Sequence, residues 1–107
     1  MNLPKVLTDL IQAQATFDSV AYADCFTDTA TVFDEGHTHT GKKEIEQWIA
    51  KANEDYKATM EPVAYEERGA VAILSAKISG SFPGSPIVLQ YHFELENGLI
   101  QSLRITG

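Results

Sequence analysis

Three side chains suited to acid–base chemistry stand close together in the first half of the chain: Asp34, His37 and His39. Asp34 ends a short β-favouring run, 30–33, and both histidines follow in a polar segment, 35–40, that is expected to be a loop. A carboxylate at a pocket wall acts as a general base when loss of solvent raises its pKa towards neutral pH. A nearby imidazole can then donate or relay a proton. We therefore expect Asp34 to be a catalytic base and His39 to polarise or protonate a substrate oxygen.

The same three residues have two other interpretations. Residues two apart in an extended segment face the same side, so the two histidines could join Asp34 around a metal ion. Alternatively, all three are simply solvated, with the aspartate opening or capping a turn. Because spacing alone does not place a complete set of ligands, we expect no metal site. The sequence also contains no nucleotide-binding motif and no recognisable nucleophile triad, so we expect no cofactor.

Tyr91 is the third candidate catalytic residue. It lies on the apolar face of a clearly alternating segment, 87–96, so its hydroxyl must find a hydrogen-bond partner or a ligand inside the fold. An internal hydrogen bond in the core is its alternative role. Arg104 could anchor a ligand carboxylate or form a salt bridge. The residues that we expect to bind a ligand, mostly aromatic side chains whose alternative role is core packing, are Phe17, Tyr22, Phe33, His37, Trp48 and Arg104.

The composition limits the classes of partner. The 107 residues suffice for a single domain, 1–107, and 44% of them are hydrophobic, which is ordinary for a folded protein. The net charge of −7, with Lys42-Lys43 as the only basic pair, argues against nucleic acid and anionic membranes as partners. Cys25 is the only cysteine, so no internal disulfide can form, and no apolar run approaches the ~20 residues that span a bilayer. We expect a soluble protein of the cytoplasm.

Hydrophobic spacing predicts helices in the first half of the chain. Apolar residues three or four apart run over 3–17, and a second short stripe, 20–26, follows Asp18, which is a favourable N-cap. A third stripe predicts a helix over about 42–52, which the polar run 53–55 ends.

The second half has the alternating period of strands. Pro62 indicates an edge strand or a bulge, and Asn97-Gly98 is typical of a two-residue hairpin turn. Helices followed by an antiparallel meander form an α+β layout, and a long twisted sheet would curl around the helices and leave a conical cavity. The predicted strands cover about 56–68, 71–79, 87–96 and 99–106.

Three stretches in this order carry a family resemblance: FTDTATVFD at 26–34, the helix start at 41–45 with Trp48, and the hairpin at 97–100 that leads to Arg104. Together they resemble the nuclear transport factor two-like superfamily, and within it the SnoaL-like proteins, which also resemble ketosteroid isomerases. The resemblance covers nearly the whole chain. It implies an α+β fold, a cone-shaped barrel of a curved, mainly antiparallel sheet wrapped around N-terminal helices, with a pocket between them and usually a homodimeric assembly.

The resemblance also suggests roles for particular residues. The catalytic base of the isomerases falls on Asp34. Their oxyanion-hole tyrosine falls near Leu10, which cannot donate a hydrogen bond, and its partner, a protonated aspartate, falls on Gln90 or Tyr91. Only the base is therefore kept, and steroid isomerisation of that type is not expected.

Two functions remain, because the family includes isomerases, polyketide cyclases, hydratases, dehydratases and members without enzyme activity. The first is a small apolar-ligand pocket with cofactor-independent proton transfer next to a carbonyl, of the isomerase or cyclase type, with Asp34 as the base. The alternative is a non-catalytic homodimer that binds a ligand or another protein. Its contact would be the outer sheet face with Val88, Gln90 and His92.

Overall fold

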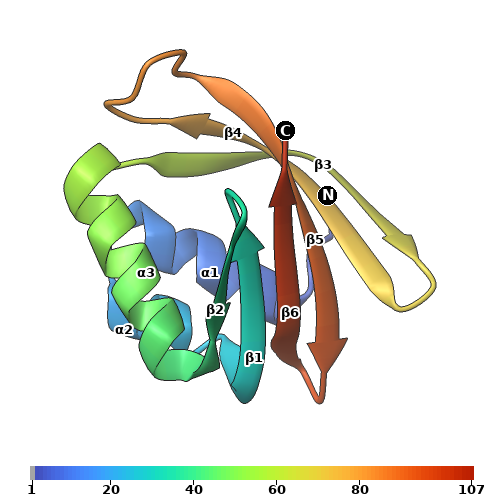
Figure 1. Cartoon of the computed structure of the whole chain (residues 1–107). Coiled ribbons are helices and arrows are strands. Elements are labelled where there is room, and N and C mark those ends of the chain that lie inside the picture. Colours follow the sequence, from blue (N-terminus) through green and yellow to red (C-terminus); the bar gives the residue numbers. More distant parts are fainter. Residues whose placement is uncertain (1) are drawn as a thin grey trace.

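The computed structural model describes residues 2–107, which form three helices and one six-stranded sheet (Figure 1). The helices are α1 (Lys5–Ala15), α2 (Ser19–Ala23) and α3 (Gly41–Tyr56). Asp18 caps α2 as predicted: its side chain accepts a hydrogen bond of 3.0 Å from the backbone N–H of Ala21. The third helix continues past its predicted end at 52.

The strands lie in the order β2-β1-β6-β5-β4-β3 across the sheet. All neighbours are antiparallel except β1 and β6, which run parallel. The predicted α+β class and the curved, mainly antiparallel sheet are confirmed. Within residues 2–107 the sheet stays open, with β2 and β3 at its edges, and does not close into a barrel. The strands are β1 (Phe26–Asp34), β2 (His37–Thr40), β3 (Thr59–Arg68), β4 (Val71–Ser79), β5 (Ile87–Glu96) and β6 (Leu99–Thr106).

Local signals in the second half of the chain are confirmed. The register of β3 shifts between Pro62 and Ala64, and this strand lies at an edge of the sheet. Asn97 and Gly98 connect β5 to β6 with φ angles of 52° and 80°, which are the positive values that a type I′ hairpin turn requires.

Two predictions in the first half are wrong. The segment 35–40 is a hairpin, not a loop: Glu35 and Gly36, with φ of 51° and 77°, form the turn, and β2 pairs with β1. Phe26 belongs to β1 and not to the second helix, because its backbone pairs with Ile100 of β6 and its ring is fully buried. The pairing of Phe26 joins it to a strand at the other end of the chain, which a local helical stripe does not report.

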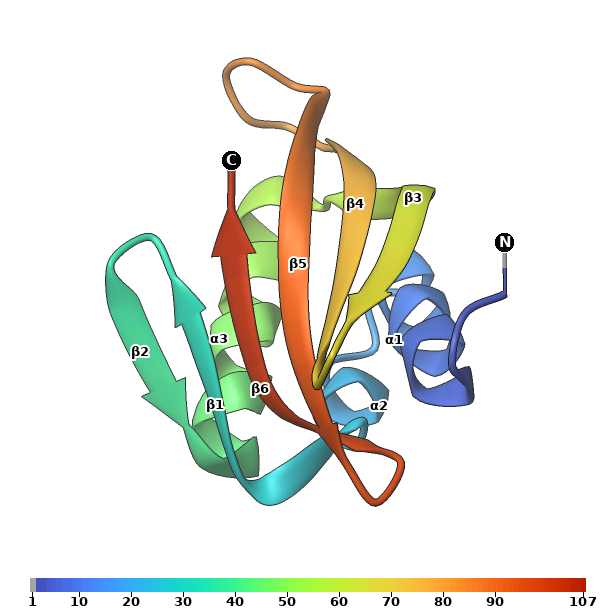
Figure 2. The ribbon, with the colours of Figure 1, turned by 90° about the vertical axis from the view of Figure 1, so that its right-hand side faces the viewer.

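The helices all lie on one face of the sheet, and the core fills the space between them (Figures 1 and 2). Figure 2 looks onto the opposite face, which no described helix covers. Among the described residues, no helix is both long and apolar enough to cross a membrane. The largest fully buried side chains, which define the core, are Phe26, Phe93, Leu7, Leu10, Ile45, Leu74, Ile100, Leu103 and Val32.

Candidate functional site

A cavity of about 860 Å³ opens between α3 and the inner face of the sheet. The three predicted catalytic residues, Asp34, His39 and Tyr91, all line it, together with Tyr22 and Trp48. The cavity therefore gathers side chains from β1, β2, β5, α2 and α3 at one site. Its apolar lining includes Ile49, Ala52, Met60, Ile78, Leu89 and Ile105.

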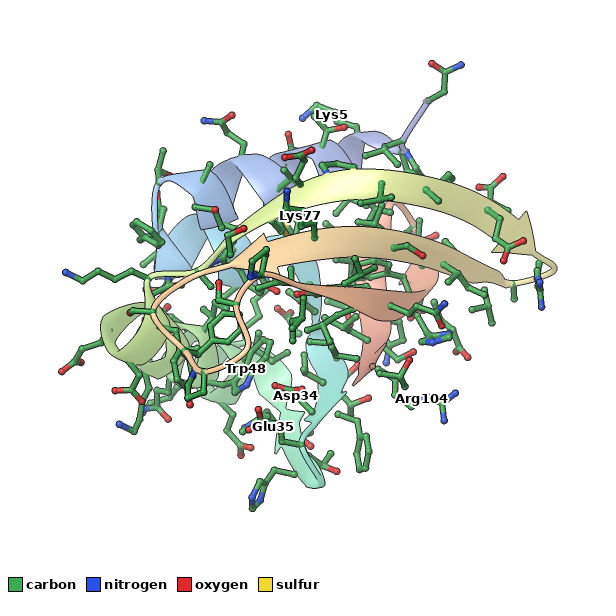
Figure 3. The ribbon with its side chains drawn as sticks, turned by 90° about the horizontal axis from the view of Figure 1, so that it is seen from above. Lys5, Asp34, Glu35, Trp48, Lys77 and Arg104 are labelled. Carbon is green, nitrogen blue, oxygen red and sulfur yellow. The ribbon has the colours of Figure 1, made fainter. Side chains whose placement is uncertain are left out.

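Asp34 faces the cavity because of the alternation along β1. Ala30 and Val32 are buried under the helices, and Asp34 follows two residues later on the same face, half-buried at the strand end. Burial raises the pKa of this carboxyl above its usual value, and the charge of Glu35 raises it further. The Trp48 side chain and the neighbouring His39 oppose this rise in pKa. Figure 3 shows Asp34 and Trp48 next to each other on the helix side of the sheet.

An aromatic wall stands beside this carboxylate. His39 pairs with Val32 across the β1–β2 hairpin and so shares its face of the sheet, and its ring stacks on Trp48 with 5.6 Å between ring centroids. The Trp48 ring in turn meets Tyr22 edge-on at 6.1 Å. The stacking holds His39 and Trp48 in place at the end of the cavity where Asp34 lies.

Two tyrosine hydroxyls face the same cavity. Tyr22 is 2% exposed and Tyr91 is 8% exposed, yet neither hydroxyl hydrogen-bonds to any other residue of the described chain. Between residues 2 and 107, no fully buried side-chain N or O atom lacks a partner, so both hydroxyls must retain accessible surface, and the space available to them is the cavity. Burial is the main cause that raises the pKa of each tyrosine, and the Asp34 charge contributes to both. Both therefore remain protonated hydrogen-bond donors at neutral pH.

Sequence reasoning missed two further polar residues, Gln14 and Asn53. Both line the cavity, are 7% and 9% exposed, and bond to each other: Gln14 Nε2 donates to Asn53 Oδ1 at 3.1 Å. The signal for Gln14 was present, because a glutamine stands in the apolar stripe of α1. The polar run 53–55 predicts the end of the third helix at Asn53, but this helix continues to Tyr56 and Asn53 is buried on its inner side.

Four predicted ligand-binding residues do not line the cavity. Phe33 and Arg104 are neighbours on the outer face of the sheet, where Arg104 lies well apart from Asp34 (Figure 3). Phe17 follows α1 and is 41% exposed, and His37 is exposed beside the hairpin turn. In the part of the chain that the structure covers, no three His, Cys, Asp or Glu side chains are grouped so as to hold a metal ion.

Acidic side chains outnumber basic ones around the cavity in the described chain. Glu35, Glu44 and Asp55 join Asp34 in the lining, whereas Lys51 forms a salt bridge of 3.2 Å with Asp55. A negatively charged ligand would meet repulsion at this mouth. The charge disfavours an anionic ligand, and the apolar side chains of the lining favour an apolar one.

Comparison with known proteins places these features in context. The profile of the SnoaL-like domain matches residues 7–103. The structure is similar to that of a candidate polyketide cyclase from Sinorhizobium meliloti, with 35% sequence identity, a TM-score of 0.92, and coverage of 97% of this chain and 95% of that one. No curated protein matches the sequence.

Two more distant structures share the fold. A protein with a ketosteroid isomerase-like fold from Catenulispora acidiphila, solved in complex with trimethylamine, is 18% identical, with a TM-score of 0.87 and coverage of 99% and 87% of the two chains. The epoxide hydrolase/cyclase-like enzyme SalBIII, described for pyran ring formation in the polyether salinomycin, is also 18% identical, with a TM-score of 0.81 and coverage of 95% and 87%.

Proposed function

This chain belongs to the SnoaL-like domain family, and from that premise we propose that it catalyses cofactor-independent proton transfer next to the carbonyl group of a small, uncharged, largely apolar ligand. Asp34 is the base that takes the proton. The observation that carries the proposal is a half-buried carboxylate of raised pKa that faces the same cavity as the hydroxyls of two buried tyrosines.

The chemistry needs a base and an oxygen-binding group. Asp34 removes a proton from the carbon next to the carbonyl, and the electrons of that C–H bond move towards the oxygen to give an enolate. Hydrogen-bond donors held at the oxygen stabilise the developing negative charge. The hydroxyls of Tyr22 and Tyr91 are such donors, and His39 is a further candidate at the same end of the cavity. Where a C=C bond adjoins the enolate, return of the proton from Asp34 to the far carbon of that bond gives isomerisation. Where the ligand carries a second carbonyl, the enolate carbon attacks its carbon, the C=O π electrons move to oxygen, and that oxygen takes the proton from Asp34, which gives an aldol-type cyclisation.

The relatives support this class of reaction without deciding between its members. The similar protein from Sinorhizobium meliloti is named for polyketide cyclase activity, and SalBIII for epoxide hydrolase/cyclase-like activity. Leu10, near which the resemblance places the isomerase tyrosine, is fully buried in the core and cannot donate a hydrogen bond. The hydroxyl of Tyr22 on α2 or of Tyr91 on β5 would take the role of that tyrosine from another side of the cavity. This difference supports substrates other than those of ketosteroid isomerases.

Deuterium exchange into a model ketone tests the proposal. 2-Tetralone is uncharged and apolar and carries acidic protons next to its carbonyl, so proton NMR in D₂O measures both its binding and the loss of its C1 signal. We expect the protein to accelerate the exchange, with a rate that rises with pH through the raised pKa of Asp34 and then levels off, because only the ionised carboxylate is a base. Binding without accelerated exchange would contradict the catalytic role and favour a binding module.

A homodimer is a second proposal, and it concerns the outer face of the sheet. This face lacks helices in the described chain (Figure 2), and Val88 on it is 54% exposed. We expect sedimentation velocity to give a dimer at micromolar concentration, and Val88→Glu to shift it to a monomer. Val20→Glu is the matched control, since Val20 is 56% exposed but lies on α2. A monomeric wild-type protein would contradict this interface.

A further inference from the structure

The Gln14–Asn53 pair has its amide groups fixed in one orientation. Gln14 Nε2 contacts both Asn53 Oδ1 and the backbone carbonyl oxygen of Ala58. A carbonyl oxygen only accepts hydrogen bonds, so the Gln14 atom at this point must be the nitrogen, and the Asn53 atom that it meets must be the oxygen. Neither amide can flip without the loss of a hydrogen bond.

This orientation leaves one donor and one acceptor free. Asn53 Nδ2 and Gln14 Oε1 have no hydrogen-bond partner within residues 2–107, although both residues are more than nine-tenths buried. Since every fully buried polar side-chain atom in this part of the chain has a partner, these two atoms retain accessible surface, and both residues line the cavity. Buried polar groups are nearly always paired in folded proteins, so these two atoms are available to a ligand.

The pair lies at a distance from the carboxylate end. Trp48 stands beside Asp34 (Figure 3), and Asn53 comes five residues later on α3. At 1.5 Å of rise per residue, Asn53 is displaced by about 7.5 Å along the helix axis. The cavity wall between them is apolar and includes Ile49 and Ala52.

We propose that Gln14 and Asn53 form a second polar binding site in the cavity, which recognises a hydroxyl group on the ligand. A hydroxyl accepts from Asn53 Nδ2 and donates to Gln14 Oε1, so it satisfies both free atoms at once. The substrate class is then a hydroxylated ketone with an apolar body between its two oxygens. The carbonyl end of this assignment rests on the function proposed above, whereas the hydroxyl end rests on the amide pair.

A matched pair of ligands tests the hydroxyl site. 6-Hydroxy-2-tetralone differs from 2-tetralone by one hydroxyl at the far end of its ring system. We expect NMR titration to show that the wild-type protein binds the hydroxylated ketone about 5- to 100-fold more tightly, the worth of the two neutral hydrogen bonds that the hydroxyl makes. Asn53→Leu should abolish this preference. Gln12→Leu, which removes an exposed amide on α1 outside the lining of this cavity, should keep it.

A measurement on the unmodified protein guards against a variant that fails to fold. The side-chain NH₂ resonances of Asn53 should shift on addition of 6-hydroxy-2-tetralone and not on addition of 2-tetralone. Equal affinities in the wild-type protein, no binding of either ketone, or a preference that survives in Asn53→Leu would overturn the proposal. Deuterium exchange distinguishes the two proposals: a preference without accelerated exchange contradicts only the proton transfer, and exchange without a preference contradicts only the hydroxyl site.

Discussion

Replacing Asp34 with Asn is expected to slow deuterium exchange into 2-tetralone by about 10²- to 10⁴-fold, the usual contribution of a general base. Asn has nearly the same shape and no basic oxygen, so ketone binding should be retained. Asp28→Asn is the matched control, because it makes the same change on the same strand at an exposed carboxylate that does not line the cavity. An Asp34→Asn variant with the wild-type exchange rate would exclude Asp34 as the base.

The same substitution is expected to stabilise the fold at neutral pH. Burial raises the pKa of Asp34 in the folded state above the value of about 3.9 in an unfolded chain. Between these two pKa values the folded state binds more protons, so the free energy of unfolding falls as pH rises through this window. Asn carries no charge, so the variant avoids the free-energy cost of holding an ionised carboxylate in a half-buried position.

The stability gain should therefore depend on pH. It should be complete above the raised pKa and should disappear well below pH 4, where the aspartate is protonated in both states. Urea denaturation of both proteins at neutral and acidic pH measures the difference. If the variant is instead less stable than the wild-type protein at neutral pH, the fold stabilises the charged form of Asp34. That result would contradict a base of raised pKa.

Removal of a tyrosine hydroxyl is expected to have the second largest effect. Tyr22→Phe and Tyr91→Phe should each slow exchange by about 10²- to 10³-fold, because each removes a donor from the enolate oxygen. Ketone affinity should change far less, since the donor matters most when negative charge develops. Stability should not fall, because neither hydroxyl has a partner within the described residues.

Tyr65→Phe is the matched control for this pair. Tyr65 lies on β3 outside the cavity lining, and its hydroxyl donates to Glu67 at 3.0 Å. Its exchange rate should equal that of the wild-type protein. If one of the two cavity variants keeps the full rate, the oxygen is held by the other tyrosine or by His39, and if both keep it, the oxygen-binding role of the tyrosines is wrong.

Several elements of the fold follow from local patterns in the sequence. The segments 71–79, 87–96 and 99–106 were predicted with the bounds that β4, β5 and β6 have in the structure. The alternation of apolar and polar residues in these strands and the Asn97-Gly98 turn involve only residues close together in the chain. They can therefore be predicted without knowledge of the tertiary structure. The candidate base was found in the same way, because Asp34 ends a β-favouring run.

Other features depend on contacts between distant segments. Phe26 belongs to β1 because its backbone pairs with Ile100 of the last strand, and no local pattern reports that pairing. Phe33 and Asp34 are adjacent in sequence, yet Phe33 faces outward and Asp34 faces inward. Alternation along a strand puts neighbours on opposite faces, and the helices decide which of the two faces is the inner one.

The family, most of the secondary structure and the candidate base follow from the sequence, because each depends on residue types and spacing along the chain. Which side chains share the cavity depends on how the chain packs. Tyr22, Asp34 and Asn53 come from three separate elements. They come together because α3 packs against the curved sheet. A pattern of residues along the chain does not report how close two segments lie when they meet only after folding.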